Sequence, residues 1–195
     1  DWGIHARSCG TGPGFQGRHN GVRDVWVRRL GELCGPQHVE REEVIPAWRR
    51  QRQGRPPEEA VLDVVLRLPG RPALALDIAV VEAACDSMVD GRGALRPGAA
   101  ARCIEANKHR RYPLNPAAPV LVPIIYEAGG RAGEEAERFL KVLCADVCVD
   151  EETRIATIRS IRQSCAAALM RGNAQMLLGP GPPAGGWPWC PRPGV

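Results

Sequence analysis

The chain has 195 residues, with 26 Lys and Arg against 22 Asp and Glu, so its net charge is +4. This length suits one medium-sized domain, and an apolar content of 44% supports a sizeable core. No run approaches the roughly 20 consecutive apolar residues of a membrane helix, which excludes a transmembrane helical protein and predicts no membrane partner. The small positive charge permits DNA or another polyanion as a partner without requiring one.

The hydrophobic spacing predicts an α/β fold, an αβββαβ core with a central mixed sheet flanked by helices, followed by two further helices. A helix over 18–34 and a strand over 39–46 precede two β-rich runs, 61–68 and 73–81, joined by a Pro-Gly turn. A helix over 99–111 and a buried strand over 120–127 complete the core. The two last helices open at Glu134 and Asp150, and the second is expected to bury Ile155. We expect a folded domain over 18–178, a loose segment over 1–17 and a disordered Pro/Gly tail over 179–195.

Two aspartates interrupt the paired β-rich runs. If the turn is centred on Gly70, residues whose numbers sum to 140 face each other, and Asp63 and Asp77 are such a pair. Two carboxylates with Cβ atoms about 5 Å apart repel each other unless one is protonated or a cation lies between them. Their oxygen atoms are ligands that suit Mg²⁺ or Mn²⁺. The alternative is that one aspartate faces solvent, or that an offset turn separates the two.

Lys108 is one of two lysines in a chain whose other basic residues are arginines. It lies in the helix predicted over 99–111, which returns over the sheet. A lysine is a compact point charge that can stabilise a phosphorane-like transition state or orient an attacking water. A helical lysine is also a common solvated surface residue, and that alternative stays open.

An upstream acid, two hairpin aspartates and a lysine in this element order resemble the PD-(D/E)XK nuclease superfamily. More narrowly, the chain resembles the restriction-like endonuclease region at the C-terminus of site-specific non-LTR retrotransposon reverse-transcriptase polyproteins. Leu62 stands where the superfamily prefers proline, and Ala79 stands where it places the lysine, so activity depends on Lys108 reaching the site. The matching segments are 3–9, 18–20 with Arg23 and Asp24, Glu42 before Ile45 and Pro46, 62–64, 76–80 and 108–112.

The resemblance implies a metal-dependent endonuclease that nicks target DNA. Asp63, Asp77 and Glu42 would hold Mg²⁺ or Mn²⁺, and Lys108 would complete the catalytic set. Such a protein is expected inside the cell, in the nucleus if it comes from a eukaryotic retroelement. Two other functions remain open: a nuclease fold that binds nucleic acid without cutting, and an unrelated α/β scaffold with accidental aspartates. Glu42 has its own alternative, as one of several acids on an exposed strand.

Basic residues near these positions are candidates for contacting the phosphates of DNA, because affinity for nucleic acid comes mainly from phosphate neutralisation. The competing explanation is a solvated basic helix end. The nucleic-acid-binding candidates are Arg18, His19, Arg23, Arg110, Arg111 and Tyr112.

The segment 1–17 resembles the remnant of a small zinc knuckle, since His5 and Cys9 match its last two ligands. These two residues supply only half a tetrahedral site, so no zinc is expected within this chain. The eight cysteines form no CxxC pair and are expected to be mostly reduced. Cys144 and Cys148, one helical turn apart, are either core residues or another half-site.

Overall fold

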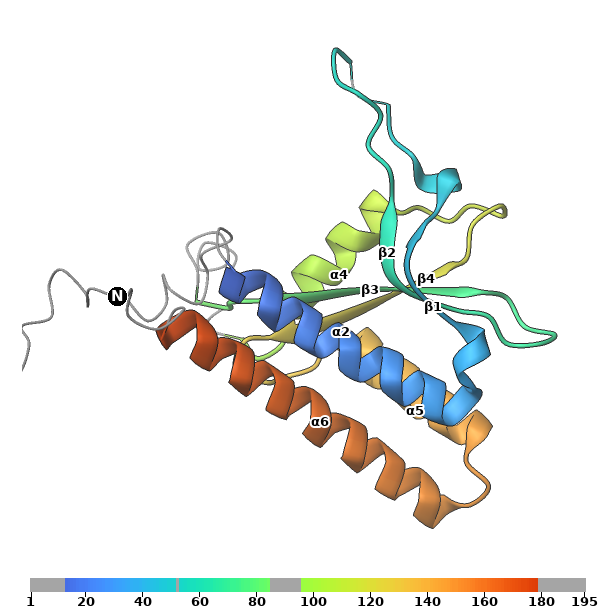
Figure 1. Ribbon diagram of the computed structural model, residues 1–195, viewed down its shortest axis with the longest axis vertical. Helices are drawn as coiled ribbons and strands as arrows, with labels where there is room; N and C mark the ends of the chain where they lie inside the picture. The colour runs from blue at the N-terminus through green and yellow to red at the C-terminus, as the bar shows by residue number, and fades with distance from the viewer. Residues whose placement is uncertain (1–12, 52, 85–95, 179–195) are drawn as a thin grey trace, which may run out of the picture.

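The computed structural model of the chain describes residues 13–51, 53–84 and 96–178 (Figure 1). Apart from two short 3₁₀ helices, the element order is helix, three strands, helix, strand and two helices, as predicted. The α/β class is thereby confirmed. His5, Cys9 and the tail 179–195 lie outside the described residues. Among the described helices, none has the length and apolar character needed to cross a bilayer.

Four strands form one mixed sheet in the order β1 (Val39–Val44), β2 (Val61–Leu66), β3 (Leu74–Val81) and β4 (Val120–Glu127). The first three strands are antiparallel neighbours, and β4 runs parallel to β3. Val64 pairs with Leu76, which confirms the predicted register in which paired numbers sum to 140. Gly70 lies in the turn with a φ of 69°, a conformation that a residue without Cβ adopts at no steric cost.

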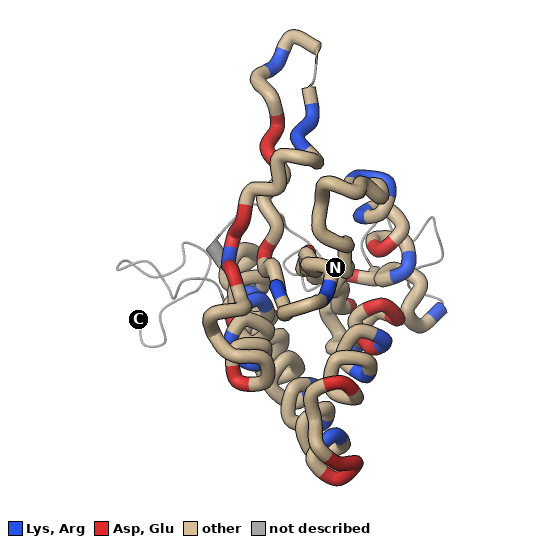
Figure 2. The backbone as a smooth tube through the Cα atoms, turned by 90° about the vertical axis from the view of Figure 1, so that its right-hand side faces the viewer, with Lys and Arg blue, Asp and Glu red and all other residues tan. Residues whose placement is uncertain are grey.

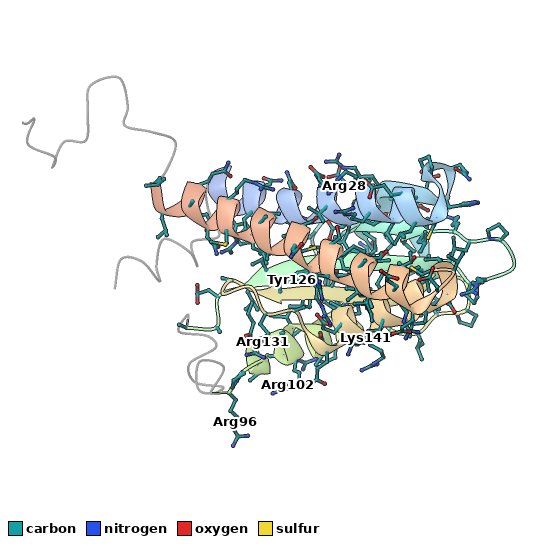
Figure 3. All side chains as sticks on the ribbon, turned by 90° about the horizontal axis from the view of Figure 1, so that it is seen from below. Arg28, Arg96, Arg102, Tyr126, Arg131 and Lys141 are labelled. Atoms are coloured by element: carbon teal, nitrogen blue, oxygen red, sulfur yellow. The ribbon has the colours of Figure 1, made fainter. Side chains whose placement is uncertain are left out.

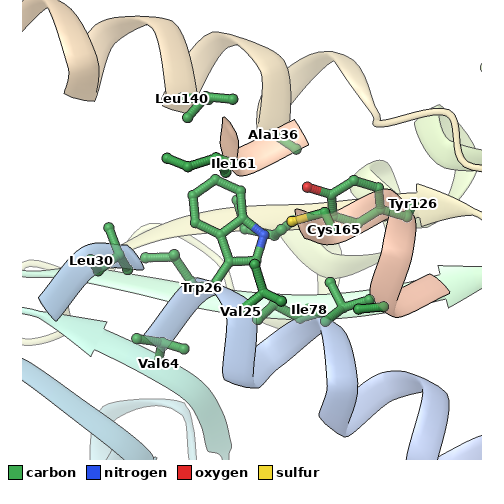
Figure 4. Packing of buried hydrophobic residues seen from close by; sticks show 14 of the residues in the cluster. Val25, Trp26, Leu30, Val64, Ile78, Tyr126, Ala136, Leu140, Ile161 and Cys165 are labelled. Atoms are coloured by element: carbon green, nitrogen blue, oxygen red, sulfur yellow. The ribbon is translucent and has the colours of Figure 1, made fainter. Parts of the chain in front are cut away.

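Helices cover both faces of the sheet (Figures 1 and 3). One face carries α2 (Pro13–Cys34), α5 (Glu134–Val147) and α6 (Glu151–Leu178), and α4 (Ala99–Arg111) lies on the other. The largest core fills the space between the three helices and the sheet. Trp26 of α2 is buried there, among Leu140, Ile161 and Tyr126, which fixes α2 against both the sheet and α6 (Figure 4).

Two sequence predictions are wrong at the helices. The first helix begins at Pro13 rather than Arg18, so the end of the segment predicted to be loose is helical. Gly14 lowers helix propensity there, but α6 packs so closely that a Cβ on Gly14 would lie 2.9 Å from Met176 Cγ. Ile155 is exposed rather than buried, because α6 meets the core further along, through Ile161, Cys165, Ala168 and Leu169.

The α2–α6 contact leaves no space for a side chain at Gly172. A Cβ at this position would lie 2.6 Å from the Cα of Arg18, which is backbone and cannot rotate away. We expect Gly172→Ala to lower the free energy of unfolding by about 1–3 kcal/mol, measured by urea denaturation, because overpacking forces the helices apart. Gly21→Ala is the matched control, since its Cβ would meet nothing closer than the Ala168 Cβ at 3.8 Å. Equal effects of the two substitutions would contradict the packing argument.

Glu105 of α4 caps the start of α5. The N-cap residue of α5, Gly133, has no side chain to do so. The buried Glu105 carboxylate accepts the backbone N–H of Glu135 at 3.1 Å and thereby satisfies one of the free donors at the helix start. Burial raises the pKa of Glu105; the N–H bond acts against this rise, and the nearby acids Glu135 and Glu134 add to it.

This raised pKa predicts how stability depends on pH. The folded chain keeps the Glu105 proton to a higher pH than the unfolded chain, so unfolding releases a proton and stability falls as pH rises above the ordinary value of 4.5. We expect Glu105→Gln to remove this part of the fall while retaining an acceptor oxygen for Glu135. Urea unfolding between about pH 4 and pH 7 measures it, with Glu134→Gln as the control. A Glu105→Gln variant whose stability falls as steeply as that of the parent would refute the assignment.

Candidate active site

Three acidic residues of neighbouring strands lie on one row across the sheet. The β1–β2 pairs have numbers that sum to 105, which puts Glu42 opposite Asp63, and the β2–β3 register puts Asp77 opposite Asp63 on its other side. Neither of these two pairs belongs to the ladder. β1 and β2 pair on either side of the Glu42–Asp63 position, and β2 pairs with β3 only from Val64 onward. At this row β2 therefore separates from β3, whereas β1 and β2 miss one pair and then pair again.

The backbone at the row is irregular. Glu42 has a φ of 53°, the one positive value among the non-glycine residues that the structure describes. Leu62 packs with Trp48 on one side of the sheet, and Val64 packs with Trp26 on the other. Residues two apart on a regular strand share a face, so β2 departs from regular pleating at Asp63.

Asp63 takes the place of a missing ladder acceptor. Its Oδ2 accepts the backbone N–H of Ile78 at 2.7 Å, and its Oδ1 lies 2.8 Å from Nε2 of His19 on α2. The side chains of Asp63 and His19 are 15% and 27% exposed. A carboxylate therefore satisfies the backbone donor of β3 at the point where β2 leaves it.

Asp77 is held from the other face of the sheet. Its Oδ2 lies 2.7 Å from Nζ of Lys108 on α4, with side chains that are 8% and 20% exposed, respectively. Burial raises the pKa of Asp77; the charge of Lys108 acts against this rise, and the neighbouring Asp63 carboxylate adds to it. Lys108 is therefore not a solvated surface lysine, and it reaches one of the two hairpin aspartates.

Glu42 is turned toward α2. Its side chain is 55% exposed and forms an ion pair with Arg23, whose own side chain is buried. Each acid of the row thus has one basic partner: Arg23 for Glu42, His19 for Asp63 and Lys108 for Asp77. The partners of Glu42 and Asp63 come from α2, whereas that of Asp77 comes from α4.

The predicted three-carboxylate metal set is not gathered at this row. Over residues 13–51, 53–84 and 96–178, no group of three or more His, Cys, Asp or Glu side chains is placed to hold a metal ion. The Asp63 and Asp77 carboxylates are near enough for the charge of Asp63 to raise the pKa of Asp77. Mg²⁺ is commonly bound through one or two carboxylates, with waters and substrate phosphate completing the shell.

Half of the predicted nucleic-acid contacts need correction. Arg18, Arg23 and Tyr112 are 1%, 3% and 5% exposed, so their side chains are not accessible to a nucleic acid. Tyr112 instead packs against Trp48, with ring centroids 5.2 Å apart. Arg110 and Arg111 are at the surface, where contact with nucleic acid stays a prediction.

The sequence does not predict the partner of His19. This residue, a candidate for contacting phosphate, instead contacts Asp63. No signal in the sequence links these two residues, because they are 44 positions apart and on different elements.

No protein-family model, curated protein or solved structure matches this chain. The function proposed below is therefore inferred from the residues of the row and its surroundings.

The His19–Asp63 contact should stabilise the fold measurably. We expect a double-mutant cycle with His19→Ala and Asp63→Ala to give a coupling energy of about 0.5–1.5 kcal/mol in urea unfolding, the usual net value of a hydrogen bond. The His109–Glu135 pair, at the same 2.8 Å but with a more exposed histidine, is the control and should couple more weakly. A coupling energy near zero for His19 and Asp63 would show that the contact does not hold in solution.

Proposed function

We propose that the chain is a metal-dependent DNA endonuclease domain of the PD-(D/E)XK type and of retroelement origin, which nicks target DNA. The observation that carries this proposal is the approach of Lys108 to Asp77, 2.7 Å away, beside Asp63 and at the point where the strands separate. The order of helices and strands and the mixed sheet are compatible with such a core.

The chemistry needs two carboxylates and one positive charge. A divalent cation held by Asp63 and Asp77 would lower the pKa of a bound water and neutralise charge on the phosphoryl oxygens. Lys108 would place its ammonium group beside the same phosphate and stabilise the negative charge that develops in the transition state. Glu42 has no part in this scheme, because its carboxylate is paired with Arg23 and its side chain is more than half exposed.

A second candidate is a nuclease-fold module that binds nucleic acid without cutting it. One observation favours it: every acid of the row already has a basic partner within the chain. A row in which each acid contacts a basic side chain without a metal can be a purely structural feature.

Cleavage of supercoiled plasmid with Mg²⁺ or Mn²⁺ tests the first candidate. We expect Lys108→Ala and Asp77→Asn each to slow nicking by at least about a hundredfold, the usual effect of removing a group that stabilises transition-state charge. Lys108→Ala should retain Mn²⁺ binding in calorimetry, whereas Asp77→Asn should lose it. Lys141→Ala is the control, because Lys141 is the chain's other lysine and lies exposed on α5 (Figure 3).

Two outcomes would contradict the proposal in different ways. A Lys108→Ala variant that nicks at the parent rate would show that the lysine assignment is wrong. A parent that binds DNA and is inert with both metals would favour the binding module.

A further inference from the structure

Between β1 and β2 the chain leaves the body of the molecule as a narrow arm, of which the structure describes residues 49–51 and 53–59 (Figure 1). The base of the arm is fixed. Trp48 is buried and donates its indole N–H to the carbonyl oxygen of Pro113 at 2.9 Å. Next to it, the backbones of Arg50 and Glu58 exchange hydrogen bonds of 3.0 and 2.8 Å, which join the outgoing and returning segments of the arm. These contacts fix the direction in which the arm leaves the molecule.

The far part of the arm has no role in the core. Gln51, Gln53 and Arg55 are exposed. Within the described part of the chain, these three side chains have no hydrogen-bond or ion-pair partner. Folding therefore does not account for three long side chains that all carry N–H donors.

The charge of the arm is positive beyond its base. Its two acids already have partners, since Glu59 pairs with Arg49 at 3.0 Å and Glu58 pairs with Arg111 at 2.6 Å. Figure 2 shows basic positions on both the outgoing and the returning segment of the arm, and acidic positions only near its base. An anionic partner is thus attracted to the end that the core leaves free.

The arm and the proposed site share α4. Arg50 donates to the carbonyl oxygens of Arg110 and Arg111 in the last turn of this helix, and Arg111 reaches back to Glu58. Lys108 lies one turn earlier on the same helix and contacts Asp77. Residues three apart on a helix are neighbours on its surface, so the base of the arm adjoins the site.

The side chains of the tip match the edges of bases. Glutamine pairs with the N6 and N7 of adenine, and arginine pairs with the O6 and N7 of guanine or with phosphates. The major groove of B-DNA is wide enough for a two-stranded ribbon, and the two segments of the arm, joined by the Arg50–Glu58 bridge, are similarly narrow. A carboxylate of an acidic protein would use only the N–H donors of a glutamine, whereas an adenine edge uses its donor and its acceptor together.

We propose that the arm inserts Gln51, Gln53 and Arg55 into a groove of the duplex DNA that lies over the Asp63–Asp77 row. The arm would thereby set a base preference on one flank of the phosphate that is cut. This inference rests on the proposed function for its substrate, but it concerns binding and can be measured without cleavage.

The test is fluorescence anisotropy of the full chain with labelled 30-base-pair duplexes in EDTA, where no hydrolysis occurs. We expect the triple variant Gln51→Ala, Gln53→Ala and Arg55→Ala to bind at least about tenfold more weakly, since each lost base contact typically costs several-fold or more. The matched control on α6 also changes one exposed arginine and two exposed glutamines: Arg159→Ala, Gln163→Ala and Gln175→Ala. It should bind like the parent.

Two partial variants separate groove reading from phosphate attraction. Selection from a randomised duplex library should show a base preference for the parent that is lost with Gln51→Ala and Gln53→Ala together. Arg55→Ala should lower the slope of log affinity against log salt by about one if Arg55 contacts a phosphate, and should leave that slope unchanged, with a lost guanine preference, if it reads a base. Each of these results supports an arm that contacts DNA.

The outcomes distinguish this inference from the proposed activity. Equal binding by the parent and the triple variant overturns the arm assignment, whatever the cleavage assay shows. Loss of binding in the triple variant together with an inert parent supports the arm and overturns the nuclease. A parent with no affinity for duplex DNA, or one for which an acidic polypeptide competes as well as DNA does, overturns the arm assignment.

Discussion

The Asp63 carboxylate fills the gap that opens where β2 leaves β3, and the arrangement around the row depends on it. A backbone N–H that is buried without an acceptor costs about 1–3 kcal/mol. Asp63 supplies that acceptor to Ile78, which lets the strands separate at this point. A partly buried carboxylate is itself costly unless it is paired, and His19 of α2 provides the partner. One side chain thereby links the sheet, the separation of its strands and the position of α2.

The other acids of the row are also paired with basic side chains. Glu42, Asp63 and Asp77 come from three strands, and their basic partners come from the helices on the two faces of the sheet. Removing one partner from a buried pair leaves an uncompensated charge, which is more costly than never having had the pair. A metal ion would therefore compete with cations that the chain already supplies. The same contacts that hold the helices to the sheet would oppose the binding of a metal ion.

Local signals in the sequence predicted a large part of the fold. The helix Ala99–Arg111 and the strand Val120–Glu127 have the predicted bounds, because apolar spacing and a following proline define them within a few residues. Asp150 directly precedes the last helix, close to the predicted start, and its carboxylate accepts the Thr153 N–H at 2.7 Å. The register of the β2–β3 hairpin could be predicted from its turn alone, because a tight turn determines which residues of the two strands pair.

The sequence by itself determined the class of fold, the register of the hairpin that carries Asp63 and Asp77, and a lysine on the helix that returns over it. Only the tertiary structure decided which charges meet. Arg18 and Arg110 are the same residue type near a helix end, yet the packing of α6 buries the first and leaves the second at the surface. Likewise His19 meets Asp63 because α2 crosses the sheet where the strands separate. Periodicity and turn chemistry act over a few residues, whereas the partner of a charge depends on elements brought together from distant parts of the chain.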